Sequence, residues 1–208
     1  MATNPEKKLY SFKQYLMLLR NSKQRLEYNH GDIYLMAGSS ANHAAISFNM
    51  CRALEDALGD DVPCRPYVVD RVVRLTPEVT VMPDVVVTCD TADHGEAFFL
   101  DSPRVVVEVL SKSTEPRDRT YKLLRYQEKQ SVQEIVLISQ YAQHVEVITR
   151  TGTSWQYCEY GYGEQFTLTS LDVTIRVADI YRRLSIPPVK RSSLPIEVVE
   201  AAEEPEDE

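Results

Sequence analysis

The sequence lacks the features that mark several large classes of protein. No apolar run reaches the roughly 18 residues that a membrane-spanning helix needs. The first residues, Met-Ala-Thr-Asn-Pro-Glu-Lys-Lys, include no apolar run that could serve as a signal peptide. Walker loops, dinucleotide-binding glycine motifs, Gly-x-Ser-x-Gly and His-Glu-x-x-His are also missing. We therefore expect a cytoplasmic protein without membrane contact and without the chemistries that those motifs support.

Cysteine and histidine are scattered rather than clustered. The four cysteines, Cys51, Cys64, Cys89 and Cys158, are widely spaced and form no Cys-x-x-Cys pair. The four histidines do not gather near them or near one another. This distribution argues against a disulfide framework and a structural zinc site, and it favours a reducing compartment.

An excess of basic residues is missing too. The formal net charge is −8, and residues 192–208 contain seven acids and no base, which leaves −1 for residues 1–191. A near-neutral body does not show the basic face that is typical of nucleic-acid-binding proteins. It does not exclude nucleic acid, because acids gathered in a metal site would hide part of a basic rim.

Length and composition predict one domain followed by a tail. A chain of 208 residues with 43% hydrophobic content can bury one core of ordinary size. From Pro187 onward the sequence is rich in proline, serine and acids. We therefore expect a domain over residues 1–186 and a disordered acidic tail over residues 187–208.

What the sequence does contain is an apolar segment with a carboxylate in its middle, Arg104–Ser111. Its run of Val and Leu predicts a strand that is buried on both faces. Alternation puts Glu108 on the same face as Val106 and Leu110. An ionised Glu in an apolar interior costs several kcal/mol unless it is paired, hydrogen-bonded or metal-bound. Glu108 is therefore a partner of a buried Arg, a residue on a wetter face, or part of a functional site.

A second acid, Asp84, stands at the start of another apolar run, Met82–Val87. Pro-Asp before a strand is also ordinary turn chemistry, so Asp84 alone is ambiguous. Carboxylates that converge from two buried strands are the ligands that Mg²⁺ uses in phosphate chemistry, where it keeps several waters. Asp84 and Glu108 together indicate a divalent-metal site.

The segment after the central strand supplies candidate cations. Ser113-Thr114-Glu115-Pro116 predicts a helix start, and the helix should run to about Lys129. Lys122 and Tyr126 are four residues apart and hence lie on one face of that helix. Asp118 stands four residues before Lys122, and we interpret those two as a surface Asp–Lys pair.

Three further polar residues have open interpretations. Lys112 begins about 13 Å along the strand from Glu108, so we expect a loop cation near the rim of the site. His43 falls in the first turn of a helix predicted over residues 41–58, where a lone histidine is more often a capping or core residue than a functional one. Glu27 lies on a predicted hairpin strand, where an exposed acid is common.

The remaining pattern predicts a mixed α/β chain. Strands 104–110 and 134–138 flank the helix after Ser113, so we expect parallel neighbours joined by a right-handed crossover. The other expected elements are a helix over 9–20 with Ser11 as cap, a hairpin of 25–28 and 32–36 turned at Gly31, strands near 65–75 and 80–89, a loop over 90–103, an antiparallel pair of 144–149 and 154–160 turned at Gly152, and a short helix over 177–184.

An ordered series of motifs resembles a large bacterial family of restriction-endonuclease-like proteins in the PD-(D/E)XK nuclease superfamily. The resemblance covers roughly residues 9–184. Pro-Asp alone is a weak signal, whereas the whole series is fairly specific. The series is Glu27-Tyr28-Asn29-His30-Gly31, Ile33-Tyr34-Leu35-Met36, Ser39-Ser40-Ala41-Asn42-His43, Pro83-Asp84, Val107-Glu108-Val109-Leu110-Ser111, Ser113-Thr114, and Asp118, Lys122 and Tyr126.

The resemblance implies a fold and an activity. The fold would be the restriction-endonuclease-like α/β core, in which helices flank a central mixed sheet. The activity would be metal-dependent phosphodiester hydrolysis of DNA, with Mg²⁺ or Mn²⁺ on Asp84 and Glu108 and with a homodimer as the working unit. The implied residues are Asp84, Glu108 and Lys122 as catalytic groups, and Glu27, His43, Lys112 and Tyr126 as supporting ones.

The chain departs from the family pattern at several positions. Superfamily members usually carry a lysine two residues after the Glu, and here that residue is Leu110. Lys112 stands where a proline is frequent, and Ile135–Ser139 lacks the usual aromatic pair and Asp. Lys122 matches a position that could supply the cation from the helix. A catalytically inactive, dimeric binding or scaffold protein on the same fold is the alternative.

Overall fold

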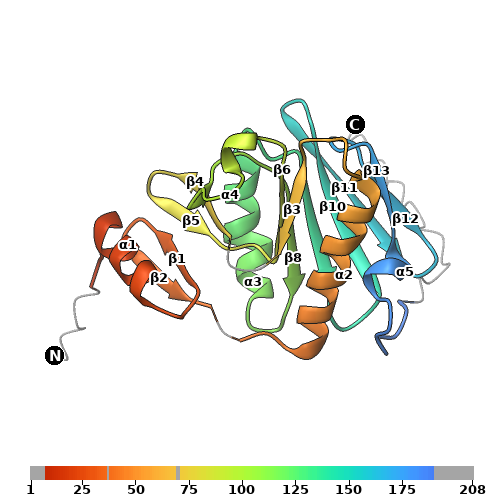
Figure 1. Cartoon of the computed structure of the whole chain (residues 1–208). Coiled ribbons are helices and arrows are strands. Elements are labelled where there is room, and N and C mark those ends of the chain that lie inside the picture. The colour runs from red at the N-terminus through yellow and green to blue at the C-terminus, as the bar shows by residue number, and fades with distance from the viewer. Residues whose placement is uncertain (1–7, 37, 69–70, 190–208) are drawn as a thin grey trace, which may run out of the picture.

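The computed structural model (Figure 1) describes residues 8–36, 38–68 and 71–189. In the described part of the chain, every helix is too short or too polar to cross a membrane. The tail expected over residues 187–208 lies outside the described residues from position 190 on. Its first residue contacts the domain, because the Pro187 carbonyl accepts a hydrogen bond of 2.8 Å from the Gln143 N–H.

Strands make up most of the regular structure. In chain order the elements are α1 (Phe12–Asn21), β1 (Leu26–Asn29), β2 (Asp32–Leu35), α2 (Ala41–Leu58), β3 (Arg65–Val68), β4 (Val72–Thr76), β5 (Val79–Val81), β6 (Val85–Thr88), the 3₁₀ turn η1 (Thr91–Asp93), β7 (Phe99–Leu100), β8 (Pro103–Leu110), α3 (Glu115–Arg117), the π-helical turn η2 (Asp118–Lys122), α4 (Leu123–Glu128), β9 (Glu134–Ser139), β10 (His144–Thr151), β11 (Ser154–Gly161), β12 (Gln165–Leu168), β13 (Val173–Arg176) and α5 (Val177–Ile180).

A six-stranded mixed sheet with the order β11-β10-β9-β8-β6-β3 forms the centre of the molecule. Strand β8 is parallel to β9, with Val107 opposite Val136, which confirms the expected parallel pair. On its other side β8 is antiparallel to β6, with Val85 opposite Val107. A strand with a partner on each side has its backbone groups paired, which suits its long apolar run.

The side chains of β8 alternate between two cores. Val105, Val107 and Val109 belong to a core cluster that includes residues of α2, β12 and β13. Val106 belongs to a second cluster, which includes Tyr126 of α4. Helix α2 and the α3–α4 segment therefore cover opposite faces of the sheet, as Figure 1 shows. Glu108 shares the alternation of Val106 and is only 2% exposed.

A second sheet, with the order β2-β1-β5-β4-β7, packs beside α1. The two strands expected near 65–75 and 80–89 are wrong in extent, because each range is divided between the sheets. Strands β3 and β6 join the central sheet, while β4 and β5 join the second one. Pro83, which has no N–H to donate, stands at the break between β5 and β6. Strand β7 lies inside the range expected to be a loop.

The C-terminal third is partly as predicted. Strands β10 and β11 form the expected hairpin, with Thr151 opposite Ser154 at its turn. The antiparallel pair β12 and β13 was not predicted. Buried and exposed residues alternate along both strands, as is typical of strands with one buried face, and Phe166 and Ile175 are among the buried ones. Helix α5 ends at Ile180 and is shorter than the expected helix over 177–184.

The predicted N-terminal cap and hairpin are confirmed. The Ser11 side chain accepts from the Gln14 N–H, and the Gln14 side chain accepts in return from the Ser11 N–H. His30 and Gly31 have φ angles of 45° and 97°, the left-handed conformations that a two-residue hairpin turn requires. This hairpin places Glu27 of β1 in the interior, at 0% exposure.

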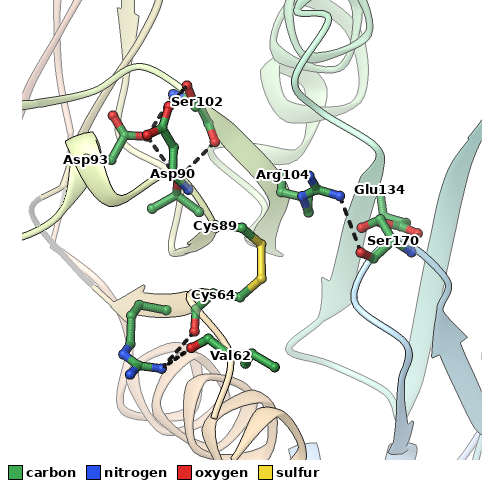
Figure 2. Close-up of a disulfide and its surroundings, with 11 residues drawn as sticks. Val62, Cys64, Cys89, Asp90, Asp93, Ser102, Arg104, Glu134 and Ser170 are labelled. Carbon is green, nitrogen blue, oxygen red and sulfur yellow. Dashed lines mark hydrogen bonds between the residues drawn. A yellow bond between two sulfur atoms is a disulfide. The ribbon is translucent and has the colours of Figure 1, made fainter. Parts of the chain in front are cut away.

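Cys64 and Cys89 form a disulfide (Figure 2), which corrects the expectation drawn from their spacing. Strands β3 and β6 are antiparallel with Arg65 opposite Thr88, so the residues that flank this pair meet as well. A separation of 25 residues in the sequence gives no sign of that meeting. Asp84 precedes β6 and Cys89 follows it, so the disulfide lies at the other end of this strand from Asp84.

Candidate active site

Two carboxylates meet because β6 and β8 are adjacent antiparallel strands. Val85 lies opposite Val107 in their register, which places Asp84 beside Glu108. The Asp84 N–H donates to the Val107 carbonyl at 3.1 Å, and its Oδ2 accepts from the Val109 N–H at 2.7 Å. The backbone of β8 thus fixes the orientation of the Asp84 side chain, which leaves its Oδ1 for another partner.

Helix α2 brings a histidine to Asp84. Ser40 caps the helix by accepting from the His43 N–H at 3.1 Å. His43 therefore lies in the first turn, and its Nε2 is 3.2 Å from Oδ2 of Asp84. The alternative of a histidine that only caps or fills the core does not describe this position, because the side chain contacts the carboxylate and lines a pocket.

Glu108 is held by two side chains from the helical segment after β8. Lys122 Nζ donates to Glu108 Oε1 at 2.9 Å, and the Tyr126 hydroxyl donates to the same oxygen at 2.5 Å. All three residues are almost fully buried. The second oxygen, Oε2, takes part in neither of these two bonds.

A π-helical turn sets the position of the lysine. The segment Asp118–Lys122 (η2) widens the helix between α3 and α4, and both of its end residues face inward. Such turns are rare and are frequent at functional sites. Lys122 Nζ lies 3.3 Å from Asp118, 3.2 Å from Glu27 and 2.9 Å from Glu108. Three buried carboxylates therefore surround one ammonium group.

Glu27 ties the hairpin lobe to this cluster. Its Oε1 accepts from the Met82 N–H at 2.9 Å, and its Oε2 pairs with the Arg117 guanidinium. Burial opposes the charged form of Glu27, but the positive charges of Lys122 and Arg117 together with the Met82 N–H lower its pKa below the ordinary 4.5.

The pKa values of two other buried acids, Glu108 and Asp118, are raised instead. Burial raises the pKa of Glu108 to about 8, with Lys122 opposing the rise and with Asp118 and Asp84 adding to it. Burial also raises the pKa of Asp118, again against the effect of Lys122. The pKa of Lys122 is raised, because Glu108, Glu27 and Asp118 outweigh the effect of its burial. Burial and the neighbouring acids thus favour the neutral form of Glu108, and an additional positive charge beside it would favour the ionised form.

The cluster opens on a pocket of 280 Å³. Asp84, Glu108, Asp118 and Lys122 are buried residues of its lining, whereas Lys112 is an exposed one, with Nζ 5.8 Å from the Tyr141 ring centroid. The described residues that complete the lining are Arg25, Met36, Gly38, Ser39, Ser40, His43, Ser111, Ser113, Thr114, Gln140 and Tyr141.

The donor set suits a hard divalent cation that keeps water. Among the described residues, no three His, Cys, Asp or Glu side chains are placed to hold a metal ion by themselves. Mg²⁺ is usually bound by one or two carboxylates and several waters, so a closed protein cage is not needed. Asp84 and Glu108 border the same pocket, and a cation beside Glu108 would offset the burial that disfavours its charged form. These two residues fit the ion.

The structure brings all seven sequence-predicted site residues together. Asp84, Glu108, Lys122, Glu27, His43, Lys112 and Tyr126 lie in or directly beside the pocket. The interpretation of Asp118 as part of a surface pair is wrong, because Asp118 is 3% exposed. The predicted ion pair of Asp118 with Lys122 does form, but sequence spacing does not show that the π-helical turn η2 buries both residues.

Sequence reasoning missed three residues that support the site. Arg117 pairs with Glu27, and the sequence held no signal for this pair, because an exposed acid is common on a hairpin strand such as the one that carries Glu27. Ser40 Oγ donates to Gln140 Oε1 at 2.6 Å, and Gln140 Nε2 donates to the Leu110 carbonyl at 2.9 Å. These two bonds join the start of α2 to the end of β8. A polar residue directly after the apolar strand β9 was the signal for Gln140.

Comparison with known proteins identifies relatives over most of the chain. A family model described as "Putative restriction endonuclease" matches residues 12–178. An uncharacterized protein of Synechocystis sp. is 30% identical over 174 residues, which are 83% of this chain and 91% of that protein. A second uncharacterized protein of the same organism is 30% identical over 149 residues, or 70% of this chain and 83% of that protein.

A solved structure has the same fold. The crystal structure of a putative nuclease belonging to DUF820 from Anabaena variabilis superposes with a TM-score of 0.66 and 17% sequence identity. The match covers 83% of this chain and 97% of that one. The expected fold class, a mixed sheet flanked by helices in a restriction-endonuclease-like core, is confirmed.

Proposed function

We propose that this chain, which belongs to the putative restriction endonuclease family, hydrolyses phosphodiester bonds of DNA with a divalent metal ion. The family and the fold are those of nuclease-like proteins. The observation that supports the reaction best is the placement of Asp84 beside Glu108 at one pocket, with the Lys122 ammonium 2.9 Å from Glu108.

Asp84 and Glu108 would hold Mg²⁺ or Mn²⁺. Such an ion, when bound, polarises a phosphoryl oxygen and makes an attacking water more acidic. The chain's own contribution is to present the two carboxylates in fixed orientations. Val109 does this for Asp84, and Tyr126 and Lys122 do it for Glu108. Asp84 would be oriented further by His43, whose Nε2 lies 3.2 Å from its Oδ2.

Lys122 would stabilise the negative charge that grows on the phosphate in the transition state. Its raised pKa keeps the ammonium charged, so it acts as a fixed positive charge and not as a base. Glu27 and Asp118 also hold its Nζ, at 3.2 and 3.3 Å. Arg117 in turn fixes Glu27. Lys112, exposed at the pocket edge, would contact a phosphate of the substrate.

An inactive, dimeric binding protein on the same fold is the second candidate. The observation that favours it is the number of carboxylates on Lys122, since contacts to Glu27, Glu108 and Asp118 can use all three of its N–H groups. In that case the ammonium would be a structural counter-ion of the acids. Both candidates would form homodimers, and light scattering on the purified chain tests that part.

A cleavage assay tests the proposed function. Supercoiled, linear and single-stranded DNA would be incubated with the purified chain in Mg²⁺, in Mn²⁺ and in EDTA. Cleavage that needs the metal and disappears in Asp84→Asn with Glu108→Gln is the expected result. Cleavage that survives in this double variant would end the proposal. No cleavage by the wild-type chain under any of these conditions would favour the binding protein.

A further inference from the structure

A second hollow lies next to the candidate active site and shares a wall with it. Its volume is 530 Å³, compared with 280 Å³ for the active-site pocket. Arg25, which stands just before β1, lines both hollows. The rest of the second lining comes from the end of α1 and the segment after it, the start of β4, Met82 and the loop around Gly95–Phe98. The two hollows are therefore neighbours on either side of the Arg25 side chain.

The charges of the two hollows differ in sign. Lys23, Arg25 and Arg71 line the second hollow, and Glu96 is the one acid among the described residues of its lining. The active-site pocket instead has Asp84, Glu108 and Asp118 in its wall. Because acids repel a polyanion, a nucleic acid needs cations close to the site to bring its phosphates there. The second hollow supplies them on the side of Arg25.

In the described part of the chain, Arg71 is oriented by hydrogen bonds to two backbone carbonyls. Its Nη1 donates to the Ala97 carbonyl at 2.9 Å, and its Nη2 donates to the Asp93 carbonyl at 3.0 Å. Its guanidinium also lies 5.1 Å from the centroid of the Tyr67 ring. Among the described residues, these carbonyls and the aromatic ring fix the guanidinium in place without pairing it with a carboxylate, so its charge can attract a phosphate.

An aromatic side chain borders the same hollow. Phe98 is 42% exposed, and the Arg20 guanidinium lies 5.4 Å from its ring centroid. Cations along a groove together with an exposed aromatic ring are typical of surfaces that bind unpaired nucleic acid, where phosphates meet the cations and a base stacks on the ring.

We propose that this second hollow, the basic groove (Lys23, Arg25, Arg71 and Phe98), binds the strand that leaves the active site. Phosphates next to the cut bond would contact the three cations, and an unpaired base would stack on Phe98. The groove would therefore favour single-stranded over duplex DNA. The proposal rests on the proposed nuclease function for the identity of the ligand, but the binding that it describes needs no cleavage.

Binding without metal tests the groove separately from catalysis. The anisotropy of labelled oligonucleotides of one sequence, single-stranded and duplex, would be measured in EDTA over a range of salt concentrations. Lys23 is exposed, so Lys23→Glu should not disturb folding. Arg182→Glu is the matched control, because it makes the same change of charge at an exposed residue that lines neither hollow. Melting temperatures verify that both variants fold.

The expected result is a loss of affinity confined to the groove. Lys23→Glu should bind the single strand about 10-fold more weakly, with the slope of log K against log salt reduced by about 0.7 for one lost phosphate contact. Phe98→Ala should lose at least about 5-fold in affinity for the single strand with little change in that slope. Arg182→Glu should stay within about twofold of the wild-type chain.

Three outcomes would overturn the groove. One is an equal loss of oligonucleotide affinity in Lys23→Glu and Arg182→Glu, which would mean that affinity depends only on the net charge of the chain. Another is tighter binding of duplex than of single strand with no effect of Phe98→Ala. The third is no binding of either oligonucleotide. Groove-dependent binding without any metal-dependent cleavage would instead remove the proposed catalysis and leave the groove in place.

Discussion

Lys122 Nζ lies 2.9 Å from Glu108 Oε1, although the lysine stands fourteen residues after the glutamate and on another element. The residue two positions after Glu108 on the strand is Leu110, which packs in the apolar core beneath α4. Lys122 is the last residue of the π-helical turn η2, and its buried ammonium group reaches the carboxylate from this helical segment. The cation of this site therefore comes from the helix and not from the strand.

Lys122→Met should remove most of the metal-dependent cleavage. The methionine keeps the apolar stem but not the charge, so we expect turnover to fall by about 10²–10³-fold, as for the loss of one charge-stabilising donor. Mn²⁺ affinity should not fall, because Asp84 and Glu108 remain. Single-turnover cleavage and Mn²⁺ titration measure the two effects. Normal turnover in a folded Lys122→Met variant would show that the lysine has no catalytic role.

Lys112→Ala should affect substrate binding more than turnover. Lys112 is exposed at the pocket edge and is not among the residues that contact Glu108 in the structure. We expect weaker DNA binding and a smaller salt dependence, with turnover at saturating DNA close to that of the wild-type chain. The reverse pattern, in which turnover depends on Lys112 and not on Lys122, would contradict the arrangement described above.

Arg117→Gln should destabilise the fold at neutral pH and much less in acid. The pKa of Glu27 is below 4.5 in the folded chain, so its ionised form stabilises the fold above about pH 4.5, and this contribution is lost as the pH falls through the folded-state pKa. Removing Arg117 weakens the contribution, although Lys122 still faces Glu27. Because Arg117 is 25% exposed, we expect about 1–2 kcal/mol at pH 7.

Urea unfolding at pH 7 and at successively lower pH, continued through the folded-state pKa of Glu27, measures this difference. Arg125→Gln is the matched control, because Arg125 pairs with Glu128 on the surface of the same helical segment. Such an exposed pair contributes only a few tenths of a kcal/mol. A loss in Arg117→Gln that is no larger than that in Arg125→Gln would show that Glu27 does not depend on Arg117.

Removal of the disulfide should lower stability without lowering cleavage. The bond closes a loop of 25 residues, which corresponds to about 3 kcal/mol from the restricted unfolded chain. It lies at the end of β6 that is remote from Asp84. Cys64→Ser should therefore melt at a lower temperature and cleave at the wild-type rate where it is folded. Cys158→Ser, which removes a free thiol, is the control. Equal melting temperatures of the two variants would contradict the bond.

The pair Asp84 and Glu108 could be predicted because burial of a charge is visible in a sequence. A buried ionised acid is unfavourable unless it has a partner, so an acid inside an apolar run indicates a pair or a site. Alternation along the strand predicts which face of the sheet the acid occupies. Helical spacing predicted that Lys122 and Tyr126 share a face, since they are four residues apart, and the family resemblance assigned them to the site. The resemblance to a nuclease family contributed Glu27 and His43, whose positions no local pattern distinguishes from those of ordinary polar residues.

Other features depend on contacts that no local pattern reveals. The inward position of Asp118 follows from the π-helical turn, which shifts the helix face. The meeting of Cys64 and Cys89 follows from the register of β3 and β6. The division of residues 65–89 between two sheets is a matter of tertiary packing, because either sheet accepts short Val-rich strands.

Calorimetric titration with Mn²⁺ tests the central claim most directly, since it needs neither the right substrate nor an active preparation. The wild-type chain should bind the ion at one site, and Asp84→Asn with Glu108→Gln should bind at least about 10-fold more weakly. Glu146→Gln is the control, because Glu146 is a buried carboxylate that Arg119 holds outside the pocket. Its Mn²⁺ affinity should match that of the wild-type chain. No Mn²⁺ binding by the wild-type chain, or equal binding by the double variant, would contradict a metal site at Asp84 and Glu108.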